Sequence, residues 1–458
     1  MTIILKNKVI ISLAISFIAF VIYSLEEQIG LYSLGGTLGV LILYIVSNDT
    51  RKQLYIILLS SILFLNTSSE GLSVLDVLTG VFYLGSLSLW FFKAKFVYHK
   101  NITRNFGDIL ILIFFSFAFV LWVPLSLLSG VDFLDMLREL LMFSLILLYF
   151  PFRDEFKTKD DLKDLLLVVA ISIIGITFIS LILSYKRLHT IEFVFQLGAG
   201  VRTNQFLSGA SIIFSIILFY LHRGKKAKIL IISILFLSMV ALIISISRIY
   251  WFGTVFGFVM ATFFISKRQR LKIYFTSFAI FATIILSVVL YFGKTSELIL
   301  GFFQKRLSSS QGYKKDISFL ARIQEYETVW EHIKEFPIGG NGINKEYSYY
   351  NLISQTNWHV NFVHNGYISL VYRFGFPMAL IFYLFLIYYF WQSFSLSLWN
   401  KNQYSKTLSA CVFASFCLLF ITNFLTTTVM FRDFYIYFPI LITILSIAKD
   451  IKKDAHQS

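Results

Sequence analysis

Long apolar runs recur from one end of this sequence to the other, and they limit its possible folds more than any other feature. Each run has roughly the 17–25 residues that an α-helix needs to cross the hydrocarbon core of a bilayer. Lipid admits only helices or closed β-barrels, and these runs are too long for barrel strands. We therefore expect an all-α polytopic membrane protein with about 12–14 transmembrane helices. The predicted spans are residues 8–25, 29–46, 53–66, 72–92, 107–128, 131–150, 163–184, 205–221, 228–246, 249–265, 271–293, 367–391, 406–428 and 432–448.

The composition excludes the soluble classes of protein. Only 14% of the residues are charged and 57% are hydrophobic, whereas a soluble domain averages about 25% charged residues. The HExxH, Walker A and GxGxxG patterns are absent from the sequence. Cys411 and Cys417 point in different directions from one predicted helix, so they form neither a disulfide framework nor a metal motif. We predict no metal site.

The net charge of +15 is concentrated in every second turn between the spans. About 25 of the 40 Lys and Arg residues fall in this set of turns, and the positive-inside rule places these turns and both termini in the cytoplasm. Because the charge is spread over many turns, it does not predict a nucleic-acid-binding face. We expect no cleavable signal peptide, because the first run lacks a small-residue cleavage site.

Few charged residues lie inside the predicted spans. Asp135, Arg138 and Glu139 share one span, and the first two are neighbours on a helix because they are three residues apart. We expect this trio to pair internally, although the segment could instead lie along the membrane interface. Arg432, at the outer mouth of the last span, is expected to pair with Asp433.

This topology places one long segment, residues 294–366, outside the membrane. A segment of that length between two spans of a compact bundle is usually functional. Within it, "FLARIQEYETVWEHIKEF" predicts an amphipathic helix that the turn "PIGGNGI" ends. The glycines of this turn either let the backbone approach a ligand closely or simply stop the helix. The predicted apolar stripe comprises Leu320, Ile323, Tyr326, Val329, Trp330 and Ile333.

Four short motifs surround this outer segment. "GVRTNQFLSGAS" (200–211) places an arginine at the outer mouth of a helix, and "SISRIYW" (245–251) forms a Ser-Arg corner between two spans. The other two are the run from Arg322 through Trp330 to "FPIGGNGI" and the stretch "HNGYISLVYRFG" (364–375). In this order and topology, the motifs resemble the periplasmic-loop signature of the O-antigen ligase and polymerase family.

The resemblance covers roughly residues 195–390 and departs from the family at one position. Family members often carry an acidic residue just before the glycine of the last motif, whereas here Arg373 precedes Phe374 and Gly375. The resemblance implies a C-type glycosyltransferase bundle with one large periplasmic loop. It also implies transfer of a glycan from a polyprenyl diphosphate carrier to a sugar hydroxyl, at the outer face of the bacterial cytoplasmic membrane, without a metal ion or other cofactor.

The chain is then expected to divide into four regions. These are N-terminal transmembrane helices (1–184), central transmembrane helices with outer-mouth arginines (185–293), the large outer loop (294–366), and C-terminal helices with a cytoplasmic tail (367–458). The implied substrate is a polyprenyl-diphosphate-linked oligosaccharide. Further implied partners are membrane lipids and other polysaccharide-assembly proteins, such as a flippase or a chain-length regulator, but no nucleic acid.

A lipid diphosphate leaving group needs fixed positive charge at headgroup depth. Arginine suits this role because it stays charged and presents a planar fork to phosphate oxygens. For Arg202 and Arg248 the alternative is snorkelling toward the outer headgroups, but the outer turns are otherwise poor in arginine. We predict a catalytic role for Arg322. The diphosphate-binding candidates are Arg202, Arg248 and Arg306.

The acceptor hydroxyl must also lose a proton, and histidine is the usual general base. His189, His332, His359 and His364 face outside in this topology. His364 alone lies where the loop re-enters the membrane, near the expected diphosphate, so we predict that it is the base. The alternative is a helix-terminal residue beside the cap Asn365, but capping gives no reason for the histidine. His359 is the second candidate.

The acceptor itself separates two closely related activities. About fourteen spans and a divergent N-terminal half favour a polymerase that extends another lipid-linked repeat, over a ligase that transfers the glycan to lipid A–core. In a polymerase the 185–204 loop, with Lys186, Arg187, His189 and Glu192, would help to hold the second carrier-bound chain. Outside that role, the functions of Lys186 and Arg187 stay open.

Two functions of other classes are disfavoured. A flippase for lipid-linked sugars needs polar groups along a path through the membrane, and mid-span charges are few, with Asp76 and Arg138 the clearest. A C-type glycosyltransferase that uses an acidic pair in its first outer loop would rely on Glu26 and Glu27. Such enzymes need a long first loop, and "LEEQIG" is barely a turn.

Overall fold

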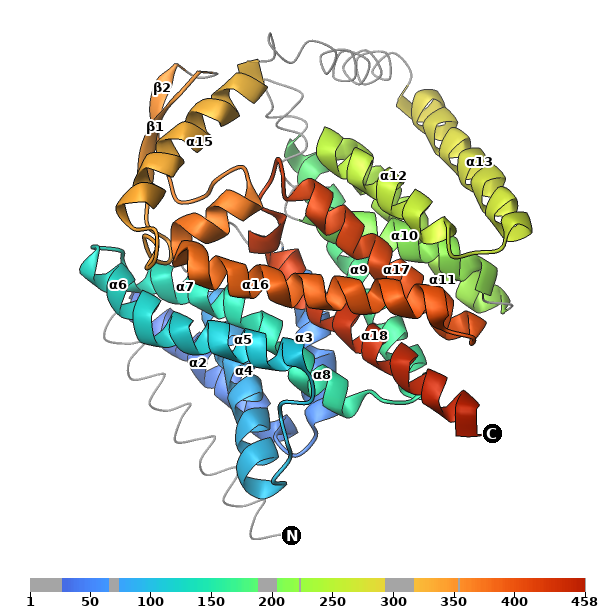
Figure 1. Ribbon diagram of the computed structural model, residues 1–458, viewed down its shortest axis with the longest axis horizontal. Helices are drawn as coiled ribbons and strands as arrows, with labels where there is room; N and C mark the ends of the chain where they lie inside the picture. Colours follow the sequence, from blue (N-terminus) through green and yellow to red (C-terminus); the bar gives the residue numbers. More distant parts are fainter. Residues whose placement is uncertain are drawn as a thin grey trace.

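The structure is a computed structural model that describes residues 27–65, 74–187, 204–221, 224–292, 317–352 and 355–457. Over these residues the chain is almost entirely α-helical and forms a bundle with a small subdomain at one edge (Figure 1). Seven helical segments of the described chain are long and apolar enough to cross a membrane, and shorter apolar helices accompany them. The prediction of an all-α polytopic membrane protein is therefore confirmed.

The first half of the described chain consists of helices that follow one another through short turns. They are α2 (Glu27–Val46), α3 (Thr50–Phe64), α4 (Val74–Phe92), α5 (Phe106–Phe117), α6 (Val123–Leu128), α7 (Phe133–Ser144), α8 (Tyr149–Glu155) and α9 (Lys159–Arg187). Three short helical turns extend or join them: η1 (Lys93–Val97), η2 (Ala118–Trp122) and η3 (Leu145–Leu148).

The second half contains the longest helices and the two strands. The helices are α10 (Gln205–Leu221), α11 (Lys225–Ile244), α12 (Arg248–Thr262), α13 (Lys267–Phe292), α15 (Ile317–Glu335), α16 (Gly366–Trp399), α17 (Gln403–Thr422) and α18 (Arg432–Gln457). The other elements are β1 (Tyr347–Asn351), β2 (Thr356–Val360) and the 3-10 turn η8 (Thr428–Met430).

The predicted spans agree with these helices. Span 8–25 lies outside the described residues, and each of the others overlaps a helix. Residues 131–150 do not form one regular helix, because α7 passes through the 3-10 turn η3 into α8. The predicted number of transmembrane helices stays a prediction.

The last three helices form the centre of the bundle (Figure 1). α17 packs against α10, α12, α16 and α18, and most of its apolar window is buried. Small residues allow this close packing: a Cβ added at Gly257 of α12 would lie only 2.7 Å from the carbonyl oxygen of Ala414 on α17. Such close approach of helix backbones at small residues is a common basis of association in lipid.

Charged residues in the spans pair between helices rather than along one helix. Arg138 of α7 lies 3.7 Å from Asp76 of α4, measured from Nη2 to Oδ2. Glu139 forms an ion pair with Arg373 of α16. The expected pair between Asp135 and Arg138 is therefore wrong, because α7 turns Asp135 outward while the next two charges face the bundle.

The expected pair between Arg432 and Asp433 is also wrong. Asp433 is fully buried, and its Oδ2 accepts the backbone N–H of Leu207 at 2.9 Å in the first turn of α10. Its carboxylate thus complements the positive N-terminal end of a neighbouring helix. Arg432 lies instead within electrostatic range of Asp76 and Glu139.

The described part of the large outer loop forms a small subdomain with its own core. α15 packs on β1, which pairs antiparallel with β2 in the register Tyr347↔Val360. Figure 1 shows these three elements together at one edge of the bundle, beside the start of α16. The buried residues of this core are Val329, Ile333, Tyr347, Tyr349, Val363 and Tyr372.

The predicted amphipathic helix is present as α15, but its buried face is different. Three residues of the predicted stripe are buried or half-buried: Tyr326, Val329 and Ile333. The other three are exposed: Leu320, Ile323 and Trp330. The buried face follows a spacing of four residues: Ala321, Glu325, Val329 and Ile333. An acidic residue therefore stands in the middle of the buried stripe.

The "PIGGNGI" turn docks onto a kink in α16. Gly375 has a φ of 72° inside this helix, which interrupts the helical hydrogen bonds. The backbone N–H of Asn341 donates to the carbonyl of Tyr372 at 2.8 Å, on one side of the kink. On the other side, the N–H of Phe376 donates to the carbonyl of Pro337 at 2.9 Å. The glycines of the turn thus let its backbone come close to the backbone of α16.

We predict that Gly340→Ala destabilises the protein and that Gly339→Ala does not. Gly340 has a φ of 70°, and a Cβ there would lie 2.5 Å from the carbonyl oxygen of Arg373. The left-handed backbone alone costs an alanine about 1–3 kcal/mol. A Cβ on Gly339 meets no described atom within 4 Å. Thermal unfolding of the purified variants measures the difference, and equal unfolding midpoints would contradict the docking of this turn.

Candidate active site

His364 lies at the junction between the outer loop and α16, and its neighbour Asn365 caps that helix. The side-chain oxygen of Asn365 accepts the N–H groups of Tyr367 at 2.9 Å and Ile368 at 3.1 Å. Its Nδ2 donates to the carbonyl of Phe424, just after α17, at 3.1 Å. The predicted capping role of Asn365 is therefore confirmed, and the cap fixes the backbone that carries His364.

The side chain of His364 contacts Glu325 of α15. The histidine Nδ1 lies 2.8 Å from Glu325 Oε2, and the backbone N–H of His364 donates to Oε1 at 3.2 Å. The glutamate side chain is 1% exposed and the histidine side chain 33% exposed. A carboxylate oxygen accepts hydrogen bonds, so Nδ1 is the donor in this contact, and in a neutral imidazole Nε2 is then the nitrogen that carries the lone pair. Within the described residues, Nε2 makes no hydrogen bond.

Two tyrosines hold this pair in place. The Tyr347 hydroxyl lies 2.8 Å from Glu325 Oε1, and burial together with the Glu325 charge raises the pKa of Tyr347. The Tyr326 hydroxyl donates to the carbonyl of His364 at 2.8 Å. Burial raises the pKa of Tyr326 to about 12, against the opposing charge of Arg322. Both hydroxyls therefore remain protonated donors at neutral pH.

Arg322 belongs to the same face of the loop as this cluster. It lies on α15, one turn before Glu325 and Tyr326, and its side chain is half-exposed. Its positive charge reaches the Tyr326 hydroxyl, which in turn contacts the backbone of His364. The structure thus brings Arg322 into the neighbourhood of His364.

Arg248 begins α12 at a sharp corner after α11. Ile246 has a φ of 55° there, and Ser247 is the N-cap residue. This geometry is the Ser-Arg corner that the sequence predicted. A left-handed backbone at a β-branched residue is strained, so the corner is held by its surroundings.

A series of polar contacts links this corner to the start of α16. The hydroxyl of Tyr250 lies 2.7 Å from Oγ1 of Thr428, and Thr428 donates to Thr422 at 2.8 Å near the end of α17. The carbonyl of the next residue, Asn423, accepts the N–H of Gly366 at 2.9 Å. The helix ends that carry Arg248 and His364 therefore meet at one end of the bundle.

The other predicted site residues are not part of this cluster, or lie outside the described residues. Arg202, Arg306 and His189 belong to the undescribed part of the chain. His359 is on β2, where its Nδ1 lies 2.7 Å from the Ser348 hydroxyl, in an exposed position.

Arg373 occupies the position where the family often has an acid. It is buried, forms an ion pair with Glu139, and donates to the carbonyl of Asn361 at 2.7 Å. The acid of this pair is therefore supplied by α7, and Arg373 connects that helix to the loop ahead of His364. In this chain the position has a structural role.

Sequence reasoning missed Glu325 and Tyr347. The predicted apolar stripe does not include Glu325, yet this residue lies on one helix face with Val329 and Ile333. A lone acid at a stripe position requires a buried partner, and this was the available signal. No comparable signal marked Tyr347, because its contact with Glu325 depends on the pairing of α15 with β1.

The comparison with known families identifies the domain that contains these residues. Residues 233–384 match the model of the O-antigen ligase family. This segment of the chain belongs to the O-antigen ligase and polymerase family. The matched segment runs from α11 into α16 and includes Arg248, Arg322, Glu325 and His364. No curated protein matches the chain.

The family of this segment indicates the general activity. The protein is a multi-pass membrane protein and a glycosyltransferase-like enzyme of the O-antigen ligase or polymerase type. Its substrate is a lipid-linked glycan, and membrane lipids surround it. The geometry around His364 provides the basis for a more specific proposal.

Proposed function

We propose that this O-antigen ligase and polymerase family member joins polyprenyl-diphosphate-linked glycan repeats at the outer face of the bacterial cytoplasmic membrane. The observation that carries the proposal is the contact between His364 Nδ1 and the buried Glu325 carboxylate. It produces a half-exposed imidazole whose second nitrogen is available to accept a proton. Such an oriented carboxylate–histidine pair is the usual arrangement of a general base.

The proposed reaction follows from this arrangement. Nε2 of His364 takes the proton of the acceptor hydroxyl while the hydroxyl oxygen forms a bond to the anomeric carbon of the donor sugar. The bond from that carbon to the carrier phosphate breaks, and polyprenyl diphosphate leaves with the bonding electrons. Glu325 stabilises the imidazolium that forms. The proton then passes from His364 to solvent or to the departing diphosphate.

Arginines compensate the charge of the leaving group in this proposal, and no metal ion is required. Arg322 stands next to the Glu325–His364 pair on α15, and Arg248 lies at the same end of the bundle. Arg202 is proposed as a further phosphate ligand on its sequence motif alone, and Arg306 only on its place in the outer loop. The planar guanidinium matches the oxygens of a diphosphate, and it keeps its charge at any physiological pH.

The orientation in the membrane follows from the distribution of basic residues. We propose that both termini are cytoplasmic and that the subdomain of α15, β1 and β2 faces the periplasm or outer medium. The starts of α10, α12, α16 and α18 then lie on the outer side, where a flippase would deliver the lipid-linked donor. A chain-length regulator is a further proposed partner.

A ligase that transfers the glycan to lipid A–core is the alternative, because the matching family model is described as O-antigen ligase. Both activities use the same donor and the same proton transfer. The extended set of predicted spans and the divergent N-terminal half favour the polymerase, in which the 185–204 loop helps to hold the second carrier-bound chain. The flippase is the less favoured alternative.

We predict that His364→Ala abolishes glycan transfer. Glu325→Gln should lower the rate constant of transfer roughly 100-fold, which is the low end of the rate enhancement that a general base contributes. The donor KM should change little, because neither side chain is proposed to bind the diphosphate. Glu327→Gln, an exposed acid on the same helix, is the matched control. The measurement is transfer in vitro with purified lipid-linked donor.

The double variant tests whether the two residues act as one unit. His364→Ala with Glu325→Gln should be no slower than His364→Ala alone, since effects within a catalytic unit are not additive. Near-normal transfer by His364→Ala would instead remove His364 from catalysis and make His359 the candidate.

A second prediction concerns the arginines. Lysine at Arg202, Arg248 or Arg322 should lose nearly as much activity as alanine, because a point charge does not replace a bidentate fork. The expected loss is about 2–4 kcal/mol of transition-state stabilisation for each, by analogy with other removed donors. The same transfer assay measures it. If all three lysine variants keep full activity, these arginines are headgroup anchors and the proposed phosphate site is wrong.

Gene deletion separates polymerase from ligase. A strain without a polymerase should still display surface glycan with a single repeat attached, because ligation continues. A strain without a ligase should leave the core bare and accumulate long chains on the carrier. Electrophoresis of the extracted surface glycan and carrier-linked glycan distinguishes the two, and a bare core with accumulated polymer would overturn the polymerase assignment.

A further inference from the structure

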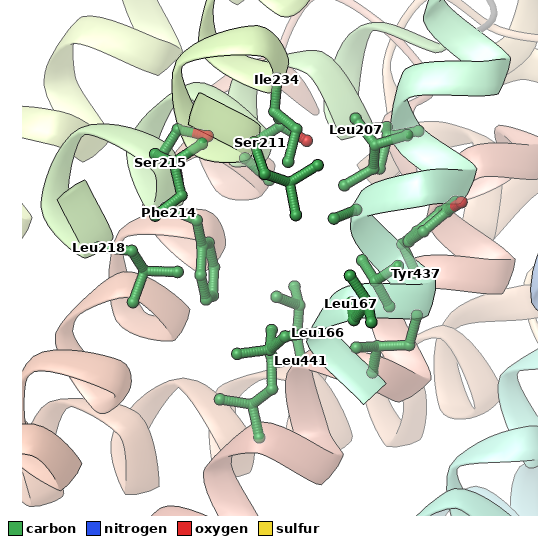
Figure 2. A pocket seen from close by; sticks show the side chains of 18 of the residues that line it. Leu166, Leu167, Leu207, Ser211, Phe214, Ser215, Leu218, Ile234, Tyr437 and Leu441 are labelled. Atoms are coloured by element: carbon green, nitrogen blue, oxygen red, sulfur yellow. The ribbon is translucent and has the colours of Figure 1, made fainter. Parts of the chain in front are cut away.

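An apolar cavity lies between α9, α10, α11 and α18, separate from the cluster around His364. Its volume is about 500 Å³. Figure 2 shows leucine, isoleucine and phenylalanine side chains around an open centre, with few oxygen atoms among them. Protein interiors are otherwise packed to the density of organic crystals, so an open apolar space of this size inside a membrane protein indicates a site for hydrocarbon.

The cavity is elongated along the helices. On α10 its lining runs from Phe206 in the first turn to Leu218 in the last turn. Twelve residues of helix rise correspond to roughly 18 Å, which is close to the thickness of one leaflet, since the whole hydrocarbon core is about 30 Å. The cavity therefore has the length of a single lipid chain from one leaflet.

Only one end of the cavity carries charge. Lys163 of α9 and Lys226 of α11 line the end at which Leu218 lies. Both lysines are largely exposed, and Lys163 also contacts Asp160 at 2.6 Å. The residues that line the opposite end, beside Phe206 and Tyr437, include no lysine or arginine within the described chain.

The neighbouring cations of the described chain do not line the cavity. Lys225 is exposed beside Lys226, and Lys228 stacks on the ring of Phe219 with its Nζ 5.0 Å from the centroid. In the proposed orientation, the charged end of the cavity faces the cytoplasmic leaflet. A lipid in that leaflet would place its headgroup beside both lysines and one chain in the cavity.

We propose that the cavity binds one anionic phospholipid of the cytoplasmic leaflet, with its phosphate at Lys163 and Lys226 and one acyl chain along α10. Charge complementarity selects this occupant. A polyprenyl carrier with its diphosphate at the outer active site would enter from the opposite end and leave both lysines without a phosphate. The site shares only the membrane orientation with the proposed function, and lipid binding at it does not depend on glycan transfer.

Native mass spectrometry of the full-length protein, exchanged into vesicles of phosphatidylglycerol and phosphatidylethanolamine, tests the proposal. Wild type should retain one phosphatidylglycerol per chain in preference to phosphatidylethanolamine. Lys163→Gln with Lys226→Gln should lower its retention roughly 30-fold, because each lysine near a membrane surface contributes about 1 kcal/mol. Lys225→Gln is the matched control and should retain lipid as wild type does.

A second pair of variants tests the apolar part of the site. Ala227→Trp places a ring in the charged end of the cavity and should remove the bound lipid. Ser233→Trp, on the same helix but outside the lining, should not. His364→Ala should retain the lipid, so loss of transfer and loss of this site are distinguishable. Three results would overturn the proposal. The wild type could retain a polyprenyl lipid, it could retain both phospholipids equally, or the lysine double variant could retain phosphatidylglycerol as the wild type does.

Discussion

The buried Glu325 carboxylate is the interaction on which the outer subdomain depends. It accepts hydrogen bonds from three directions: from the ring and backbone of His364 and from the Tyr347 hydroxyl. These donors belong to the loop ahead of α16 and to β1, while the acceptor belongs to α15. A buried carboxylate is stable only when such donors surround it. The contacts that set the geometry around His364 are therefore the same contacts that hold the loop in its fold.

The subdomain is joined to the bundle by backbone contacts and one ion pair. The "PIGGNGI" turn bonds to both sides of the kink at Gly375, and Arg373 connects α7 to the loop carbonyl of Asn361. Backbone contacts between segments leave little freedom for rotation, since each has a fixed direction. His364 is thereby held at a constant height relative to the ends of the spans.

The sequence predicted those features that depend on local pattern. The positions of most helices followed from apolar runs, and the cap Asn365, the Ser-Arg corner and the helix of the outer loop followed from short motifs. Contacts between distant segments were not predictable: Asp135, Arg138 and Arg432 were assigned to sequence neighbours, whereas charges in lipid pair across helices. Glu325 was missed because its partners lie on other elements, and its value as a site residue depends on them.

The three central helices are synthesised after the other described helices. α16, α17 and α18 supply the middle of the bundle, and α16 supplies the backbone that docks the outer turn. A chain emerging from the ribosome, N-terminus first, has therefore inserted most of its helices before their shared centre exists. The subdomain of α15, β1 and β2 cannot close its own core before His364 and Tyr372 have been synthesised. Premature termination upstream of α16 would thus yield inserted helices that lack their central packing partners. Such a product would be exposed to membrane proteases instead of being a partly active enzyme.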